Sequence, residues 1–209
     1  MYILCFIFYQ TWQQNAIEQY NSPDRNAFFS SVFNNYFFLL CALVSIFPFA
    51  LRLCYPWLVG ENYQASSQYL FLNSLYVMAF SLAAFFEIAY QCAKQTARIL
   101  PSLIMAIGVS IACNFLFIEY IKVNGVILSS ILTYVSLLIY RIIDTRKFVQ
   151  IKFAWRNILP LTILSVCFML YYQPLPFVVD LIVCGSVIVL FGFIAPKSFK
   201  ESILKKVLS

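Results

Sequence analysis

The sequence predicts an all-α fold: a polytopic transmembrane helix bundle of about six full spans plus a truncated N-terminal helix. Of the 209 residues, 63% are hydrophobic and only 11% are charged, whereas a soluble domain usually has about 45–50% apolar and about 25% charged residues. The mean hydropathy is +0.85. The long runs are apolar on every side, which favours helices over barrel strands, because strands of a barrel alternate apolar and polar residues.

The first apolar run, Met1–Tyr9, is too short to cross a membrane. Its nine residues give about 13.5 Å of helix, against a hydrocarbon core of about 30 Å. We therefore assign residues 1–12 to the truncated end of a transmembrane helix. The polar stretch 13–35 follows as a cytoplasmic connection, and the first full span, 36–59, is interrupted by a proline and by Arg52.

Three further spans follow at short intervals. Span 69–90 has Glu87 as its only charged residue. Span 99–118 opens with Pro101, which suits a first helical turn because its missing N–H would be unpaired there in any case. Span 123–140 starts at an Asn-Gly pair. Each is close to the roughly 20 apolar residues that a membrane helix needs.

The C-terminal part of the bundle is predicted to contain two more spans. Span 157–172 is shorter than the others and has Pro160 in its first turn. Span 175–195 ends before Pro196, because proline cannot continue a helix. The bundle thus covers residues 36–195, and residues 196–209 form a basic tail that we expect in the cytoplasm.

Basic residues gather on one side of this topology. With the first connection placed in the cytoplasm, only Arg52 and Lys122 lie on the outer side. Cytoplasmic loops of membrane proteins carry such an excess of Lys and Arg, so the C-terminus is predicted to be cytoplasmic. This excess of basic residues, which can face anionic lipid headgroups, explains the net charge of +6. A nucleic-acid partner is therefore not needed to explain it. The cytoplasmic side holds Arg25, Lys94, Arg98, Arg141, Arg146, Lys147, Lys152, Arg156, Lys197, Lys200, Lys205 and Lys206.

The composition also argues against metal and cofactor chemistry. The chain has no His, which excludes imidazole bases and His metal ligands. Its seven Cys are irregularly spaced in apolar runs, where a thiol acts as a small hydrophobic group. We expect no catalytic residues, no metal site, no cofactor and no enzymatic activity.

Glu87 is the acidic residue embedded within a predicted span. Ionisable groups in membrane helices are costly and mark a cavity, a pathway or a pairing partner. At 100° per residue, Asn73 and Tyr76 lie within about 60° of Glu87 on one helix face. These three residues are candidates for lining a hydrophilic cavity. The alternative is that Glu87 reaches the cytoplasmic interface and pairs with Lys94 or Arg98.

Arg52 and Asn114 complete the set of candidate substrate-cavity residues. Arg52 lies near the outer end of its span, where it either extends its charge to the headgroups or contacts a phosphate or a sugar acid. Asn114 lies in the second half of its span. It either donates an interhelical hydrogen bond or contacts substrate.

Several local patterns together resemble one family. They are Trp12-Gln13-Gln14-Asn15-Ala16-Ile17-Glu18-Gln19-Tyr20 with Phe28-Phe29-Ser30-Ser31-Val32-Phe33, then Gly60-Glu61-Asn62-Tyr63-Gln64-Ala65, Ala93-Lys94-Gln95-Thr96-Ala97-Arg98, Asn114-Phe115-Leu116-Phe117-Ile118 and Asn124-Gly125. In order and spacing they resemble segments of Wzx-type polysaccharide and O-antigen flippases. These belong to the multidrug/oligosaccharidyl-lipid/polysaccharide exporter superfamily. The resemblance covers residues 12–141, about two-thirds of the chain.

The resemblance implies one lobe of a two-lobe flippase in the bacterial plasma (inner) membrane. It implies membrane translocation of an undecaprenyl-pyrophosphate-linked oligosaccharide by alternating access, for polysaccharide or lipopolysaccharide biosynthesis. It also implies membrane lipids, a missing N-terminal lobe and other polysaccharide-assembly proteins as partners. We expect the chain to be a C-terminal fragment of such a transporter.

Two other classes of function remain as alternatives. A drug or lipid exporter of the same superfamily has loops as short as these. A polytopic glycan polymerase or acyltransferase generally needs a large outer loop or a His-containing site, and neither occurs in this sequence. Glycosyltransferase genes next to the gene for this chain would favour the flippase.

Overall fold

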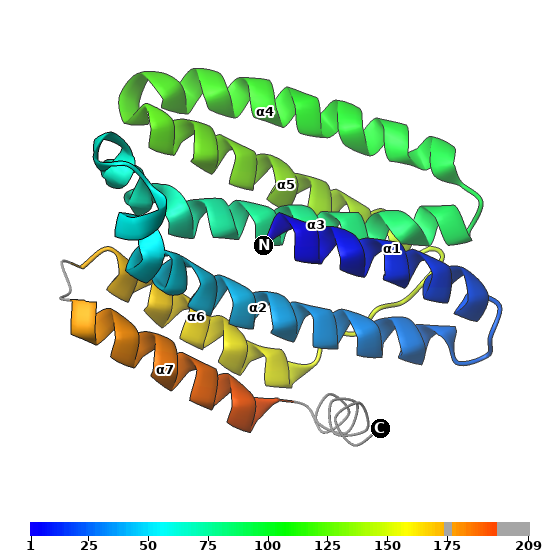
Figure 1. Cartoon of the computed structure of the whole chain (residues 1–209). Helices are drawn as coiled ribbons and strands as arrows, with labels where there is room; N and C mark the ends of the chain where they lie inside the picture. Colours follow the sequence, from blue (N-terminus) through cyan, green and yellow to red (C-terminus); the bar gives the residue numbers. More distant parts are fainter. Residues whose placement is uncertain (174–176, 196–209) are drawn as a thin grey trace. The chain divides into compact units, whose positions relative to one another are not determined.

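The computed structural model describes residues 1–173 and 177–195 (Figure 1). Within these ranges every regular element is helical, which confirms the all-α prediction. The contacts divide the chain into two units, Met1–Phe33 with Leu72–Lys152 and Asn34–Phe71 with Phe153–Ser209. The basic tail predicted for 196–209, and with it the side of the membrane predicted for the C-terminus, lies outside the described residues.

Among the residues that the structure describes, four helices are long and apolar enough to cross a membrane, and this property is compatible with a membrane protein. The prediction of six full spans is therefore wrong in number. The helices over the predicted spans 157–172 and 175–195 are apolar but shorter, Trp155–Tyr171 and Val178–Ile194. The helix over 157–172 has nearly the predicted bounds, so the error was to count so short a run as a full span, since about 20 residues are needed to cross a hydrocarbon core.

The first unit is formed by four helices and the start of a fifth. In Figure 1, α3, α4 and α5 run side by side, with α1 next to α3. Ala83, Ala106 and Leu137 form a small core where α3, α4 and α5 meet, and Tyr134 and Leu138 pack against it. The elements are α1 (Tyr2–Gln19), the beginning of α2 (Arg25–Leu58), α3 (Leu70–Cys92), the 3-10 turn η2 (Thr96–Arg98), α4 (Ile99–Ile121) and α5 (Val123–Thr145).

The segment predicted as a cytoplasmic connection, 13–35, is largely helical. Helix α1 continues to Gln19 and α2 begins at Arg25, so only a short turn separates them. Trp12 is buried and stacks on Phe85 of α3, with a centroid distance of 4.8 Å and an interplanar angle of 6°. Phe29 meets the same indole edge-on at 4.9 Å. Buried aromatic rings thus extend the folded core into a segment that its polar residues had marked as a loop.

The second unit is built on the long remainder of α2. Figure 1 shows α6 (Ile158–Tyr171) and α7 (Phe177–Ile194) beside it. The 3-10 helix η1 (Glu61–Tyr69) follows α2, and a short 3-10 turn, η3 (Trp155–Asn157), precedes α6. An aromatic core joins α2, the first turn of α3 and the end of α6, because Phe49 of α2 meets Phe71 and Tyr171 edge-on at 6.4 and 5.4 Å. Offset and edge-on ring pairs at such distances are favourable.

The segment that connects α5 to α6 is held by side chains of α2. In the first unit, the backbone N–H groups of Gln150 and Lys152 donate to Asn26 Oδ1 and Ser30 Oγ at 3.0 and 2.9 Å. In the second unit, the N–H of Ala154 donates to Asn34 Oδ1 at 2.8 Å. Two residues of an extended chain advance by about 6.6 Å, and four residues of a helix advance by about 6.0 Å. The N–H groups of every second residue in the connection therefore lie opposite every fourth residue of α2.

Helices α4 and α5 are joined by the single residue Lys122. Its φ of 51° lies in the left-handed region, which is uncommon for a residue with a side chain. Directly after this turn, Gly125 is buried against the backbone of α4. A Cβ there would overlap the carbonyl oxygen of Phe117 and lie 2.7 Å from its carbon. Only glycine permits this close approach.

We predict that Gly125→Ala destabilises the α4–α5 hairpin by about 1–3 kcal/mol, because the added methyl group forces two backbones apart. Gly108→Ala in α4 is the matched control, since a Cβ at Gly108 meets nothing within 4 Å. The control should keep or raise stability, as alanine is the better helix former. Unfolding midpoints of both variants in the same detergent measure the difference. Equal midpoints would contradict the close approach at Gly125.

Candidate functional site

The predicted polar stripe of α3 faces α5. The ring of Tyr76 meets Tyr134 at 5.5 Å, and Phe80, one turn further, meets the same ring at 5.3 Å. Ala83 then packs with Leu137. These α3 positions and Glu87 are spaced by four, three and four residues, so they share one helix face. The face that we expected to line a cavity is thus a helix–helix contact over most of its length, while Asn73 at its other end is exposed.

At the end of this contact, Glu87 pairs with Arg141 of α5. Arg141 Nη1 lies 2.9 Å from Glu87 Oε2 and donates to the carbonyl oxygen of Ala83 at 2.8 Å. The Arg141 side chain is 2% exposed, and that of Glu87 is 30% exposed. A buried guanidinium group therefore meets a carboxylate that remains open to the surface. The Nε of Arg141 has no hydrogen-bond partner among the described residues.

Helix α1 adds further polar groups close to this pair. Gln91, one turn after Glu87 on α3, donates to the hydroxyl of Tyr9 at 3.2 Å. Gln13 donates to Oε1 of Gln91 at 2.6 Å. We refer to Tyr9, Gln13, Glu87, Gln91 and Arg141 as the Arg141 cluster, and this cluster is the candidate functional site.

One of the two interpretations of Glu87 paired it with Lys94 or Arg98, whereas in the structure its partner is Arg141. The assignment of Arg141 to a loop was wrong. Instead α5 continues to Thr145 and carries Arg141 on its buried face. Arg98 pairs with Asp144 at 3.1 Å. When Lys and Arg residues are counted on each side of the membrane, a single Arg at the end of an apolar run is assigned to the loop that follows it.

A sequence signal for Arg141 does exist. Small and polar residues recur at every fourth position of α5, and such a row is one of the ridges by which helices pack. Extending the row by one step beyond Leu137 places Arg141 on the buried side. The buried residues of α5 are Gly125, Ser129, Thr133, Leu137, Arg141 and Thr145.

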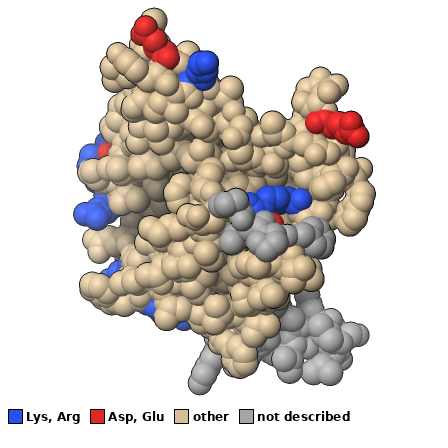
Figure 2. All heavy atoms as spheres, turned by 90° about the vertical axis from the view of Figure 1, so that its left-hand side faces the viewer, with Lys and Arg blue, Asp and Glu red and all other residues tan. Residues whose placement is uncertain are grey.

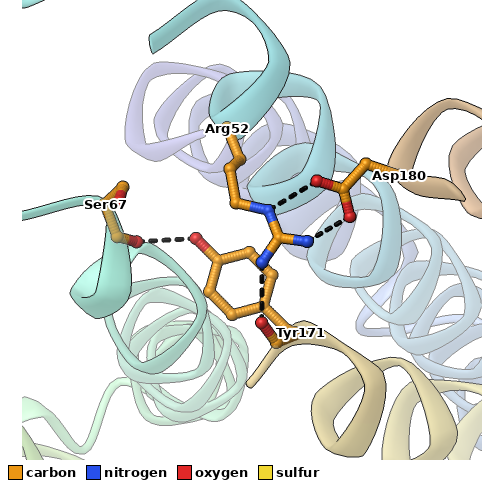
Figure 3. A network of polar contacts seen from close by, with 4 residues as sticks. All are labelled: Arg52, Ser67, Tyr171 and Asp180. Atoms are coloured by element: carbon orange, nitrogen blue, oxygen red, sulfur yellow. Dashed lines mark hydrogen bonds and ion pairs between the residues drawn. The ribbon is translucent and has the colours of Figure 1, made fainter. Parts of the chain in front are cut away.

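Arg52 lies in a second polar network, within the second unit (Figure 3). Its Nε donates to Oδ2 of Asp180 on α7 at 2.7 Å, and its Nη2 contacts the other carboxylate oxygen. Its Nη1 donates at 2.7 Å to the carbonyl oxygen of Tyr171, at the end of α6. The hydroxyl of Tyr171 in turn donates to the carbonyl oxygen of Ser67 in η1 at 2.6 Å. One guanidinium group thus connects α2, α6 and α7.

The same guanidinium group is packed against aromatic rings. Its Cζ lies 4.6 Å from the centroid of Tyr171 and 5.6 Å from that of Phe49. Arg favours such sites because its planar group stacks on rings and grips a carboxylate with two donors. The anion that Arg52 contacts in the structure is the side chain of Asp180, a partner that neither of the two roles considered for Arg52 included. The sequence offered no signal for this pair, whose members are 128 positions apart.

Asn114 is not a member of the Arg141 cluster. Its amide donates to the carbonyl oxygen of Ser110 in its own helix at 2.8 Å, and among the described residues no hydrogen bond joins it to a neighbouring helix. Of the five predicted site residues, the structure therefore places Asn73, Tyr76 and Glu87 along α3. It places Arg52 and Asn114 elsewhere.

Charged side chains are sparse on the face shown in Figure 2, where most of the surface is formed by uncharged residues. Large apolar side chains are exposed on α4 above all, such as Phe115 and Leu116. Comparison of the chain with protein-family models, curated proteins and solved structures finds no match. The fold and the two networks define a helical protein with apolar, span-length helices that carry internal ion pairs.

We predict that Glu87→Gln destabilises the chain by about 3 kcal/mol or more, because it leaves the buried Arg141 cation without its counter-charge. Adding Arg141→Met to this variant should recover part of the loss, since no buried charge then remains. Arg98→Met is the matched control at a more exposed pair and should cost less than about 1 kcal/mol. Unfolding titrations in mixed micelles measure all three. A loss from Glu87→Gln no larger than that of the control would contradict the burial of Arg141.

In the second network, Arg52→Met should release α7, because it removes three contacts and leaves the carboxylate of Asp180 unpaired in a buried position. Hydrogen exchange of the α7 amides should accelerate at least tenfold, which corresponds to about 1.4 kcal/mol. Tyr171→Phe is the control, since it keeps the ring next to Arg52 and removes one hydrogen bond. Its cost should be about 0.5–1.5 kcal/mol. Unchanged exchange in Arg52→Met would show that the pair does not hold α7.

Proposed function

We propose that this chain takes part in moving a lipid-linked oligosaccharide across the bacterial inner membrane. The observation that carries the proposal is the Arg141–Glu87 pair, which lies within two span-length helices, α5 and α3. Ionisable residues in membrane helices are rare, and they mark substrate and ion pathways. The flippase-like motifs of the sequence supply the class of substrate.

The chemistry of the Arg141 cluster suits an anionic lipid headgroup. A guanidinium group binds phosphate oxygens with two donors, as it binds a carboxylate. The partly exposed Glu87 occupies one side of Arg141, and the Nε of Arg141 has no partner in the described chain. In the proposed mechanism a diphosphate replaces Glu87 at Arg141, and Glu87 re-forms the pair when the headgroup leaves. Gln13 and Gln91, which are hydrogen-bonded to each other and to Tyr9 in the structure, would exchange these bonds for sugar hydroxyls.

The proposal includes a topology. The ends of α3 and α5 that carry Glu87 and Arg141 lie close in sequence to Lys94, Arg98, Arg146 and Lys147. Basic residues concentrate on the cytoplasmic side of membrane proteins. The cluster would therefore open toward the cytoplasm, where lipid-linked oligosaccharides are assembled, and the C-terminus would be cytoplasmic.

Deleting the gene for this chain in its host tests the proposed function. Undecaprenyl-pyrophosphate-linked repeat units should accumulate in the inner leaflet, and surface polysaccharide should fall. Plasmid-borne wild-type chain should reverse both effects. Arg141→Lys should restore less than about a tenth of export, since Lys lacks the second donor. Arg98→Met, outside the cluster, should restore export fully.

Two results would overturn the proposal. One is normal surface polysaccharide in the deletion strain with no accumulated lipid-linked repeat unit. The other is full export with Arg141→Lys at wild-type protein levels. Sensitivity of the deletion strain to drugs, with glycan export intact, would point to the exporter alternative.

A further inference from the structure

Helix α4 leaves most of its surface uncovered. It packs against α5, and it is the least buried of the four span-length helices that the structure describes. A row of exposed or half-exposed residues runs along it at alternating intervals of four and three positions. We call this row the α4 seam. Its members are Leu100, Ile104, Ile107, Ile111, Asn114, Ile118 and Ile121.

The spacing of the α4 seam is that of a coiled coil. Apolar residues that alternate by four and three positions repeat every seven residues and form the contact between paired helices. The seam covers three heptads, about 33 Å of helix, and its apolar members are 42–62% exposed. At 100° per residue it points about 130° away from Ser102 and Ala106, the buried residues of α4. The seam is therefore directed away from the helix on which α4 packs.

The polar member of the seam is poorly suited to lipid. The amide of Asn114 donates to the carbonyl oxygen of Ser110 at 2.8 Å, but its own Oδ1 accepts no hydrogen bond from the described residues. Asn114 lies seven residues before Ile121, the last residue of α4, which is about 10.5 Å along the axis. At that depth acyl chains offer no donor, and an unsatisfied polar group is costly.

We propose that the α4 seam binds the α4 seam of a second copy of this chain. Copies of one membrane protein share a topology, so their α4 helices run parallel about a two-fold axis along the membrane normal. In a parallel pair each seam residue lies opposite its own copy. The seam carries no charged residue, so identical copies meet without repulsion of like charges.

The carboxamide of Asn114 favours this occupant, because it is complementary to itself. It has two N–H donors and an acceptor oxygen, so each copy donates to Oδ1 of the other and keeps its bond to Ser110. An antiparallel pair would place Asn114 opposite Ile107 and leave the oxygen unsatisfied. Interhelical hydrogen bonds of this kind join helices in membranes, and one polar residue in a seam fixes its register. The inference rests on the membrane location within the proposed function and is independent of transport.

Two photo-crosslinking positions of equal exposure and depth test the proposal. Ile104 on the seam and Leu116 off the seam are both 62% exposed, and each lies six residues from the middle of α4. A genetically encoded diazirine amino acid replaces one or the other in the full chain, which is expressed in bacterial membranes and irradiated. Products are identified by size and by their crosslinked peptides.

The adduct between two copies should be about tenfold more abundant from position 104 than from position 116, because seam residues insert between those of the facing helix. Equal amounts from both positions would overturn the proposal. Only lipid adducts at position 104, or an adduct with a different protein there, would also overturn it. Arg141→Lys, which should impair export, should keep the adduct at position 104, so failure of transport and failure of pairing are distinguishable.

A second measurement uses the chain without a crosslinker. Asn114→Leu should weaken self-association about tenfold, since two interhelical hydrogen bonds are lost. Asn114→Gln is the matched control, because it retains a carboxamide, and it should stay closer to wild type. Single-molecule photobleaching of the tagged full chain at a series of protein-to-lipid ratios counts the copies in each particle. Monomers at every ratio in the wild type, or equal association of wild type and Asn114→Leu, would contradict the proposed pairing.

Discussion

A cation within an apolar helix bundle must have its counter-charge supplied by the protein, and this requirement fixes how the helices pack. Arg141 meets it with Glu87 and with the carbonyl oxygen of Ala83, both on α3. Arg52 meets it with Asp180 on α7 and with the end of α6. In each unit the register between two helices is thus tied to a single guanidinium group, because sliding one helix by a turn would separate the charges by about 5.4 Å.

Aromatic packing supplies most of the remaining order. The indole of Trp12 lies flat against Phe85 and edge-on to Phe29, so α1, α2 and α3 meet at one group of rings. Phe49 does the same for the second unit through Phe71 and Tyr171. In a bilayer, where lipid is as apolar as the rings, such pairs stabilise helix packing through van der Waals contact and ring geometry. The high aromatic content therefore has a structural explanation in the packing of each unit.

The helices were predictable from the sequence, whereas the partners of the charges were not. Long apolar runs must become helices in an environment that cannot hydrate the backbone, so α2 to α5 follow from composition. Helix ends depend on weaker signals, which is why α5 was ended at Tyr140 and Arg141 was assigned to a loop. Glu87 was singled out because a charge in an apolar run is conspicuous in itself. Its partner, 54 positions away, depends on which helices become neighbours, and local sequence does not contain that information.

The hydrogen bonds between α2 and the α5–α6 connection have a consequence for how this protein evolves. Asn26, Ser30 and Asn34 accept from backbone N–H groups at 150, 152 and 154. Every residue except proline carries such a group, so these three bonds need no particular side chain at 150, 152 and 154, whereas they do need the acceptors on α2. Loss or gain of one residue in the connection would move each N–H donor by one position, which is half of the two-residue spacing that aligns the donors with α2. Related sequences should therefore vary in the composition of this connection and keep its length.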